Sequence, residues 1–546
     1  MSSLTSTLLL HGAKEHLLAL WSHINSSKTL LFPKTKNQKI SISAAVALTG
    51  LYLIYRKLTL PPPNLRHIPR VNFVQFVGNL LKRRPFDEIY KETIAPLASA
   101  TDHGVYAAIG MAGWTAFISK PESTKKLLLK TELFPKSTKT KAKRHTMLGK
   151  FLMGPNVLFL TDGPHWRAQR SVLNPAFHRS MPIQLFGELT QRLFGELDKV
   201  ADDSPFDIVD IMHRWTLDAI GIAGFDFDFK ATVEENSEWV VRYNHIIKDS
   251  VHPFFLLFPV FDSPRLWFLF PKRRKSHEEL DLFLDKIQEI ITHKREVLAN
   301  SDKESTPDKK INEKDLLTLM LEAGEEENNR LTDEEIKSNL CAFFIAGHDT
   351  TASALSFAIY NLATHPEIQQ KAREEAIRVL GDEPVDTLPT LDQIKDMPYI
   401  QMIIKETLRL YPIIPSTISR IVAEDTDVGG CVLYKGTPVT FNAMALHRHP
   451  LVWSNPDTFN PERFAPGGEA ESVSKMGFGW VPFSNGARMC IGMNFSMTEQ
   501  RVLLPMLLRK YEISLPLDSI HKEKVNITGM LFLKPYNLTV NLKRRY

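Results

Sequence analysis

The chain has few cysteines for its length. Its 546 residues include three, Cys341, Cys431 and Cys490, and no two of them form a C-x-x-C pair. Three cysteines are too few for a disulfide framework, and the missing pair argues against a structural zinc site. The cysteine content therefore favours a reducing compartment.

The sequence also lacks a glycine- and serine-rich linker and an internal repeat, although its length would allow three or four domains. One large domain is the simpler interpretation. The net charge of +5 is a mild excess that suits an acidic partner or a membrane surface and does not suggest nucleic acid. A hydrophobic content of 43% and a charged content of 24% are ordinary for a globular protein.

One uncharged run stands out near the N-terminus, at residues 40–55. If Arg56 and Lys57 snorkel, a helix over 40–60 is about 30 Å long, enough to cross a thin bilayer. We therefore predict a transmembrane anchor over 40–60. A buried helix or an interfacial anchor remains open, because the uncharged core is short. About forty residues precede the run, which argues against a cleaved signal peptide.

Three consecutive prolines begin at Pro61 and predict a stiff hinge over residues 61–70. The predicted organisation is an N-terminal segment at 1–39 without an assigned function, the anchor, the hinge and one domain at 71–546. Cations flank the anchor on both sides, so charge alone does not fix its orientation.

A ten-residue stretch, 483–492, places Cys490 at the start of an apolar helix predicted over Ile491 to Arg509. Unpaired N–H groups and the helix dipole favour a thiolate there, and a shielded thiolate is a good axial ligand for iron. Phe483 can shield the sulfur, and Arg488 suits a carboxylate or propionate. Gly486, like Gly492, permits a tight turn and close approach of a flat ligand. The alternative is a buried structural cysteine.

A second pattern lies in a long helix predicted over Thr332 to Thr364, which starts with an acidic capping box. Gly347, Thr350 and Thr351 share one face of this helix. A glycine and hydroxyl groups in mid-helix favour a local opening with an inserted water. Packing alone is the other explanation for such an irregularity.

Two further spacings suggest paired side chains. Trp166 and Arg170 lie four residues apart, on one face of a helix. Glu406 and Arg409 are i,i+3 partners in an apolar helix predicted over Tyr399 to Tyr411, and a buried ion pair there needs another partner, for which Arg463 is the candidate.

Together these patterns resemble the haem-thiolate monooxygenases, the cytochrome P-450 family. The matching motifs are the Cys490 loop, A-G-x-D-T-T at 346–351, W-x-x-x-R at 166–170, and the E-x-x-R and P-E-R-F elements around Arg409 and Arg463. The resemblance runs from about residue 61 to the end of the chain. It implies a mainly α-helical fold with a minor β portion and a haem b whose iron is bound by Cys490.

The resemblance also implies roles for the other residues. Gly347 would leave space beside the iron, and Thr350 and Asp349 would deliver protons. His348 occupies the variable position of its motif and is not assigned as a ligand. The implied propionate contacts are Arg488, Trp166, Arg170 and Arg420. The implied structural ion cluster is Glu406, Arg409 and Arg463.

The implied reaction inserts one atom of dioxygen into a lipophilic small molecule, for which steroid, fatty acid, terpenoid and xenobiotic remain open. No flavin or NADPH module is evident, so the electrons would come from a separate NADPH–cytochrome reductase, with cytochrome b5 as a further partner. The resemblance places the catalytic domain on the cytoplasmic face of the endoplasmic reticulum membrane, held by a single-pass anchor. A haem-thiolate isomerase or dehydratase and a non-catalytic haem sensor are the alternatives.

Two other segments attract attention. Residues 252–270 are rich in bulky apolar side chains followed by cations, which indicates either a substrate-access lid at a membrane or ordinary core packing. The resemblance also implies a substrate-contacting turn over 528–532. A basic run is interpreted as a solvated loop or a contact for an acidic partner; it consists of Lys136, Lys139, Lys141, Lys143 and Arg144.

Overall fold

A computed structural model describes residues 36–137, 145–152, 157–178, 181–301, 314–325, 331–529 and 531–546. Four members of the basic run, at 139, 141, 143 and 144, lie outside these ranges, as does most of the N-terminal segment. Contacts divide the chain into two units, Met1–Pro61 and Pro62–Tyr546.

The described part of the first unit is helix α2, Lys36–Thr59. Apolar side chains on it are exposed, including Val46, Leu48 and Leu51. Within the described ranges, no helix combines the length and the hydropathy needed to cross a bilayer. The predicted transmembrane anchor over 40–60 is therefore not confirmed.

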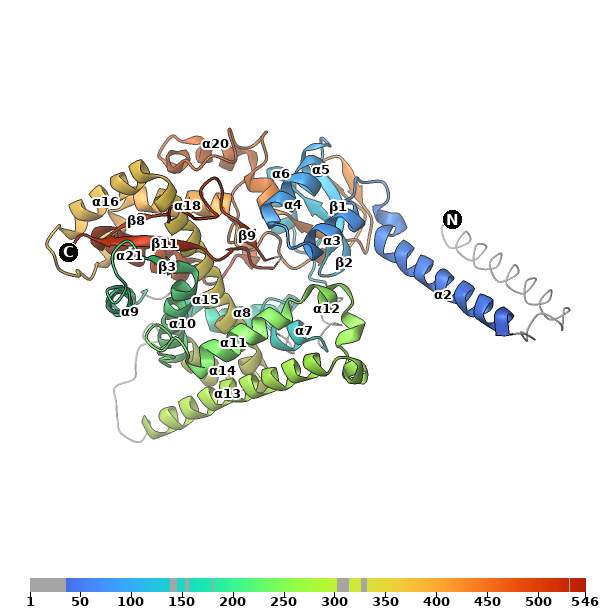
Figure 1. The fold of residues 1–546 in the computed structure, drawn as a ribbon, viewed down its shortest axis with the longest axis horizontal. Helices are drawn as coiled ribbons and strands as arrows, with labels where there is room; N and C mark the ends of the chain where they lie inside the picture. Colours follow the sequence, from blue (N-terminus) through green and yellow to red (C-terminus); the bar gives the residue numbers. More distant parts are fainter. Residues whose placement is uncertain are drawn as a thin grey trace. The chain divides into compact units, whose positions relative to one another are not determined.

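The second unit is mainly α-helical with a minor β portion, as predicted (Figure 1). Its α-helices are α3 Phe73–Leu81, α4 Phe86–Thr93, α5 Ala95–Ser99, α6 Pro121–Leu129, α7 Met147–Leu152, α8 Gly163–His178, α9 Ile183–Leu197, α10 Ile208–Phe225, α11 Glu238–Ser250, α12 Pro253–Leu257, α13 Pro271–Ser301, α14 Leu316–Glu325, α15 Asp333–Thr364, α16 Pro366–Leu380, α17 Leu391–Lys395, α18 Pro398–Leu410, α19 Ala443–His447, α20 Glu469–Met476 and α21 Met493–Lys510.

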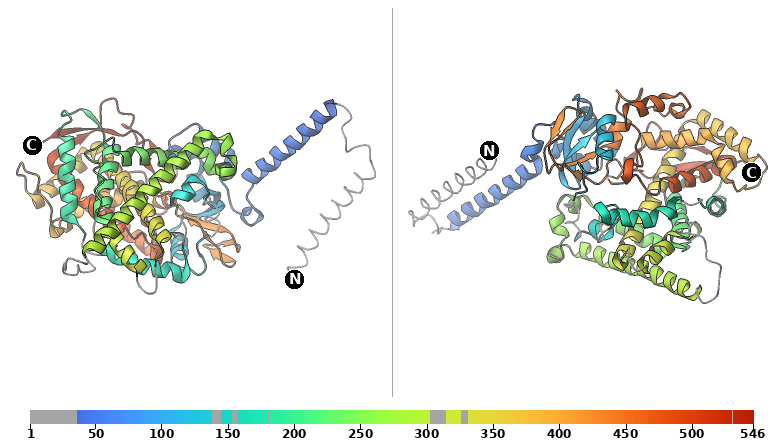
Figure 2. Two further views of the ribbon diagram at one scale, coloured as in Figure 1. Left: turned by 90° about the horizontal axis from the view of Figure 1, so that it is seen from below. Right: turned by 180° about the vertical axis from the view of Figure 1, so that it is seen from behind.

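The strands form small sheets. One has the order β1-β2-β7-β4, with β2 and β7 parallel and the other pairs antiparallel. It lies to one side of the unit with α3 to α6, while the long helices fill the rest (Figures 1 and 2). The strands are β1 Val105–Gly110, β2 Gly113–Ile118, β3 Pro205–Asp207, β4 Arg420–Ile421, β5 Thr426–Val428, β6 Cys431–Leu433, β7 Pro438–Phe441, β8 Tyr511–Ser514, β9 Ile527–Thr528, β10 Lys534–Pro535 and β11 Thr539–Arg544.

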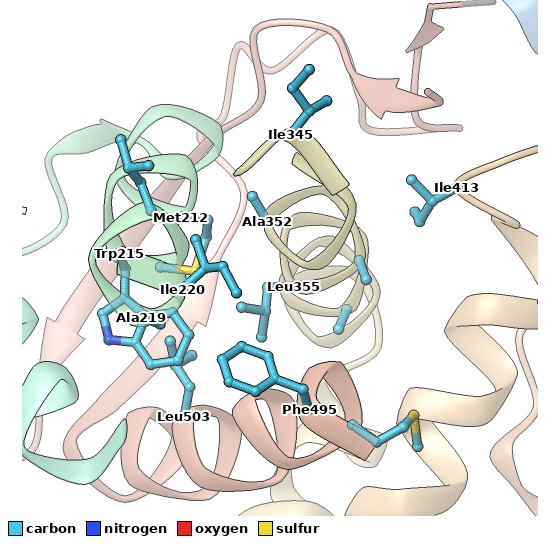
Figure 3. Close-up of a cluster of buried hydrophobic side chains, with 14 of the residues drawn as sticks. Met212, Trp215, Ala219, Ile220, Ile345, Ala352, Leu355, Ile413, Phe495 and Leu503 are labelled. Carbon is cyan, nitrogen blue, oxygen red and sulfur yellow. The ribbon is translucent and has the colours of Figure 1, made fainter. Parts of the chain in front are cut away.

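Helix α15 crosses the core, and its bounds confirm the prediction. Thr332 caps its N-terminus in a reciprocal capping box with Glu335, and the helix ends directly before His365 and Pro366. Side chains on nearly all sides of α15 are buried, as expected of a helix surrounded by other elements. Figure 3 shows the apolar contacts among α10, α15 and α21, with Ile220, Leu355 and Phe495 converging.

The predicted ion cluster is assembled in the core beside α18. Arg409 binds both carboxylate oxygens of Glu406, at 2.7 and 2.8 Å, and Arg463 approaches the same carboxylate at 3.3 Å. Arg409 also donates to the carbonyls of His447 and Pro456. The three charged side chains are almost completely buried, so each depends on the others for compensation.

Candidate active site

A cavity of about 230 Å³, partly open to solvent, lies between the Cys490 loop and α15. It brings together two segments that are about 140 positions apart in the sequence, which only the tertiary fold can do. Asp349, Gly486 and Arg420 are not part of its lining. The predicted site residues that do line it are Trp166, Arg170, Gly347, Thr350, Phe483, Arg488 and Cys490.

The Cys490 loop is a tight turn just before α21. The Cys490 N–H donates to the carbonyl of Phe483 at 2.9 Å, which closes the loop. Gly486 has φ +70°, and a Cβ added to it would lie 3.1 Å from the carbonyl oxygen of Leu128 on α6. Gly486 is therefore needed for the turn and for close packing against α6.

The thiol of Cys490 has accessible surface toward the cavity and dense protein on its other sides. Burial raises its pKa, although the N–H of Gly492 and the charge of Arg170 favour the thiolate. Shielding of the sulfur by Phe483 was expected from the sequence, but the rise in the thiol pKa that burial causes was not. A bound metal ion would reverse the balance, because a coordinating thiol is deprotonated outright.

Cations gather at one end of the cavity. Arg488 donates to the carbonyl of Thr161 at 2.8 Å, pairs with Asp162 and stacks on the Trp166 ring at 3.8 Å. Burial, with repulsion from Arg420 and Arg488, lowers the pKa of Lys136 to about 7. Lys136 was interpreted from the sequence as part of a solvated loop, yet it lines the cavity.

The remaining predicted propionate contacts have protein partners. Arg170 donates to Asn174 at 2.8 Å, and Arg420 donates to the carbonyl of Leu127 at 2.9 Å. The indole of Trp166 lies beneath the Arg488 guanidinium. Arg420 is close enough to Lys136 and Arg488 to lower the pKa of Lys136, so it belongs to the same cationic group.

The residues present fit a haem. Cys490 lines a largely apolar cavity and could bind iron there, and another part of the wall comes from small side chains of α15. Among the described residues, the positive charge at this end of the cavity exceeds the negative charge of the Asp162 carboxylate. The positive charge comes from Lys136, Arg170, Arg420 and Arg488. Two propionate groups would supply the missing negative charge and the bidentate acceptors that arginine prefers.

Helix α15 supplies the wall opposite Cys490. The hydroxyl of Thr350 donates to the carbonyl of Ala346 at 2.8 Å, one turn earlier. The helix is continuous from Asp333 to Thr364, so the expected local opening is absent from it. The Thr350 hydroxyl already donates to the Ala346 carbonyl, so this carbonyl does not need a hydrogen bond from an inserted water.

Gly347 lines the cavity but has a packing reason of its own. A Cβ added there would lie 2.6 Å from Cγ1 and 3.2 Å from Cβ of Ile220 on α10. The glycine therefore lets α10 and α15 approach closely, which is the explanation that sequence reasoning kept as the alternative.

Asp349 faces away from this cavity. Its Oδ2 accepts a hydrogen bond from Tyr243 of α11, and its Oδ1 lies 3.4 Å from His213 and 3.5 Å from His348. The sequence motif therefore does not place Asp349 and Thr350 on the same surface. His213 and Tyr243 were missed because no motif contains them.

A second cavity, of about 200 Å³, shares no described lining residue with the first. Its wall is mostly apolar and includes Phe255 and Leu256 of the predicted lid and Leu531 of the predicted substrate turn. Other lid side chains are exposed, among them Phe268 and Leu269. The lid thus contributes both to a chamber wall and to an apolar surface.

Comparisons with known proteins agree with these features. The family model described as Cytochrome P-450 matches residues 69–542. Mouse cytochrome P-450 4V2 is 29% identical, over 97% of this chain and 99% of that protein. Human cytochrome P-450 4V2 is 31% identical, over 71% of this chain and 74% of that protein. Rabbit cytochrome P-450 4A6 is 34% identical, over 65% and 69%.

Proposed function

Because this chain belongs to the cytochrome P-450 family, whose members bind haem b through a cysteine thiolate, we propose that Cys490 is its iron ligand. Membership makes the protein an oxidoreductase of the monooxygenase class. The observation that carries the assignment of Cys490 is its position in the cavity, opposite Thr350 of α15 and beside the cationic group.

Bound haem supplies the centre at which dioxygen is reduced and one oxygen atom is inserted into the substrate. The loop around Cys490 prepares the sulfur for this task. Phe483 lines the cavity beside it and limits water access, while the Gly492 N–H and the charge of Arg170 favour the thiolate. Both interactions act on the proximal sulfur and set how strongly it donates electrons.

The cationic group would hold the propionates. Arg488, Arg170 and Lys136 reach the cavity directly, and Arg420 adds positive charge behind them. Trp166 supports the Arg488 guanidinium by stacking. Asp162 keeps Arg488 aimed at the cavity, so the site is oriented before the cofactor binds.

Thr350 and Asp349 are the proposed proton donors. Thr350 has its hydroxyl at the cavity wall, held by the Ala346 carbonyl, from which it can turn to donate. Asp349, one residue earlier, is supported by Tyr243 on the opposite side of α15. Gly347, which also lines the cavity, would leave space beside the iron.

The second cavity is the proposed substrate chamber. Its mostly apolar wall suits a steroid, fatty acid, terpenoid or xenobiotic and offers few polar groups. The lid of residues 252–270 and the turn at 528–532 would close over the substrate, as suggested by Phe255, Leu256 and Leu531 in the wall.

Electrons would come from NADPH through a separate reductase, with cytochrome b5 as a second donor. The proposed location is the endoplasmic reticulum membrane, with the catalytic unit on the cytoplasmic side. The exposed apolar side chains of α2 and of the lid support contact with lipid.

The test begins with the reduced protein and carbon monoxide, whose complex has a distinct absorption when a thiolate binds the iron. Turnover is then measured with a panel of lipophilic compounds, NADPH and purified reductase. Product that requires both NADPH and reductase supports the monooxygenase. Product formed from a peroxide without reductase would indicate the isomerase or dehydratase, and haem binding with no acceleration of NADPH use would indicate a sensor.

The proton assignment has its own variant, Thr350→Ala. We expect the thiolate-type carbon monoxide complex to remain, while about a hundredfold less product forms per NADPH and hydrogen peroxide accumulates. Unchanged coupling of NADPH use to product would contradict the role of Thr350.

A further inference from the structure

Asp349 lies in a buried polar cluster that connects three helices. His213 of α10 and His348 of α15 approach its Oδ1 at 3.4 and 3.5 Å, and Tyr243 of α11 donates to its Oδ2. Asp349 and His348 are buried, whereas the side chain of His213 is 18% exposed. The cluster thus extends from the catalytic helix toward solvent, and His213 is its outer member.

The hydrogen bonds of the two histidines fix their tautomers. Nδ1 of His213 lies 2.7 Å from the carbonyl of Val209, and Nδ1 of His348 lies 2.6 Å from the carbonyl of Phe344. A carbonyl oxygen only accepts, so each Nδ1 must carry a hydrogen. In the neutral form of each ring, Nε2 is then an acceptor, and both Nε2 atoms face the same carboxylate oxygen.

Three acceptors would therefore meet with no hydrogen between them if Asp349 were ionised and both rings were neutral. Tyr243 satisfies only the other carboxylate oxygen. Among the residues that the structure describes, no lysine or arginine forms an ion pair with Asp349. A buried carboxylate without a cation is costly, and one added proton removes both the lone-pair repulsion and the uncompensated charge.

We propose that Asp349, His213 and His348 hold one exchangeable proton in common, and that His213 receives its replacement from solvent. When Asp349 gives up its proton, His213 takes up a proton from solvent and passes it from Nε2 to Oδ1, which restores the shared proton. The use of this proton in the reaction rests on the proposed function. The presence of the proton in the cluster does not. The distances from Oδ1 of Asp349 to the two Nε2 atoms are longer than those of a strong hydrogen bond, and they would shorten during proton transfer.

The surroundings disfavour His213 as the resting place of the proton. Burial lowers the pKa of His213 to about 4, with Lys534 of β10 and His348 acting in the same direction and Asp349 opposing them. Tyr243 remains a neutral donor, since burial and the nearby Asp349 raise its pKa well above its usual range. His213 therefore accepts a proton briefly and passes it on.

Vibrational and nuclear magnetic resonance spectra of the purified full-length protein test the shared proton without turnover. We expect an infrared carbonyl band of a protonated carboxyl at neutral pH, lost in Asp349→Asn and shifted in His213→Gln and His348→Gln. Nitrogen-15 spectra of labelled histidine should show both rings in the Nδ1–H form. An ionised Asp349 with two neutral rings across pH 5 to 9 would overturn the proposal.

Turnover tests the path. Glutamine can keep the hydrogen bond to Val209 but cannot carry a transferable proton, so His213→Gln should lower product formation about tenfold and increase the solvent deuterium isotope effect. The matched control is His245→Gln on α11, because His245 is exposed and lies outside the cluster. This variant should have the same product formation and the same solvent deuterium isotope effect as the unmodified protein. The carbon monoxide complex and the melting temperature should not change in either variant.

If His213→Gln couples NADPH use to product as well as the control does, His213 is not the entry point and the path is wrong. If the carbon monoxide complex shows no thiolate signature, the proposed function fails instead, while the spectra still decide whether the cluster holds a proton. The two failures are therefore distinguishable.

Discussion

The two walls of the Cys490 cavity are assembled in different ways. The thiolate wall comes from one stretch, residues 483–492, closed by a backbone hydrogen bond between Cys490 and Phe483. The oxygen wall is a face of α15 whose neighbours come from α10 and α11, far away in the sequence. The first wall is defined by local spacing, and the second depends on how three helices pack.

This difference predicts how each wall responds to mutation. A change in the thiolate wall should remove a function and leave the rest of the fold intact, because the loop is short and self-contained. A change in the oxygen wall should also affect packing, because Gly347 in this wall contacts Ile220 of α10. The following predictions, from the largest effect to the smallest, test this separation.

The largest effect is expected from Cys490→Ala. The variant should lose the thiolate-type carbon monoxide complex and all product formation, because no other described thiol lines the cavity. The matched control is Cys431→Ala, whose thiol is buried in a separate cluster with β5 and β6, and which should keep both properties. Absorption spectra of the reduced protein provide the measurement. A thiolate signature in Cys490→Ala would show that the wall is misassigned.

The next effect is expected from Glu406→Gln, which leaves Arg409 buried without its carboxylate. Breaking such a pair costs about 3 to 5 kcal/mol in the free energy of unfolding, measured with urea. Arg409 also donates to the carbonyl of His447, whose Nε2 accepts from the Val481 N–H at 2.8 Å, just before the Cys490 loop. The thiolate wall should therefore loosen first, seen as faster haem loss.

The control for this prediction is Asp396→Asn in the exposed Arg378–Asp396 pair, where both side chains are more than half exposed. Its unfolding free energy should change by less than about 0.5 kcal/mol. Equal losses in the two variants would mean that the Glu406 cluster stabilises the core no more than a surface pair does.

Much of the fold and of the thiolate wall could be predicted from the sequence, because their signals are local. The capping box at Thr332 marks the start of α15. The ion cluster was also predictable, since a charged i,i+3 pair among apolar neighbours needs a further partner. The capping box and the Glu406–Arg409 pair each lie within one helical turn, whereas Arg463 is more than fifty positions away and was named through the family motif.

What the sequence could not show depends on contacts between distant elements. Lys136 looked like part of a surface loop because its neighbours are basic, yet packing turns it into the cavity. Gly347 contacts Ile220, and Asp349 contacts Tyr243, across more than a hundred positions. The membrane anchor is a different case: its apolar run is visible in the sequence, but the described helices do not confirm a span.

A smaller effect is expected from Gly347→Ala. The added Cβ would collide with Ile220, whose branched side chain is stiff, so α10 and α15 must separate. Overpacking of this kind costs about 2 kcal/mol, reduced by the higher helix propensity of alanine. In the Ile220→Ala background the same substitution should become neutral or stabilising. If product formation stays low in the Gly347→Ala, Ile220→Ala double variant, the space at Gly347 is needed for activity in the cavity as well as for helix packing.

The smallest effect is expected from Lys136→Met, and its sign should depend on the cofactor. Without haem, burial and the neighbouring Arg420 and Arg488 hold the pKa of Lys136 at about 7, below the value of an unfolded lysine. Between about pH 7 and pH 10 the unfolded chain therefore binds more protons, so stability rises with pH across this window. The variant should lack this rise and should exceed the unmodified protein in stability most clearly below pH 7.

With haem bound the comparison should reverse, because a propionate would satisfy the charge of Lys136. Its loss should lower haem affinity about fivefold, the equivalent of about 1 kcal/mol for one hydrogen bond. Urea unfolding of the haem-free protein at several pH values and haem titration measure the two halves, with the exposed Lys130→Met as control. If the haem-free variant shows the same pH dependence as the unmodified protein, Lys136 belongs to the surface, and the cationic end of the cavity consists of arginines.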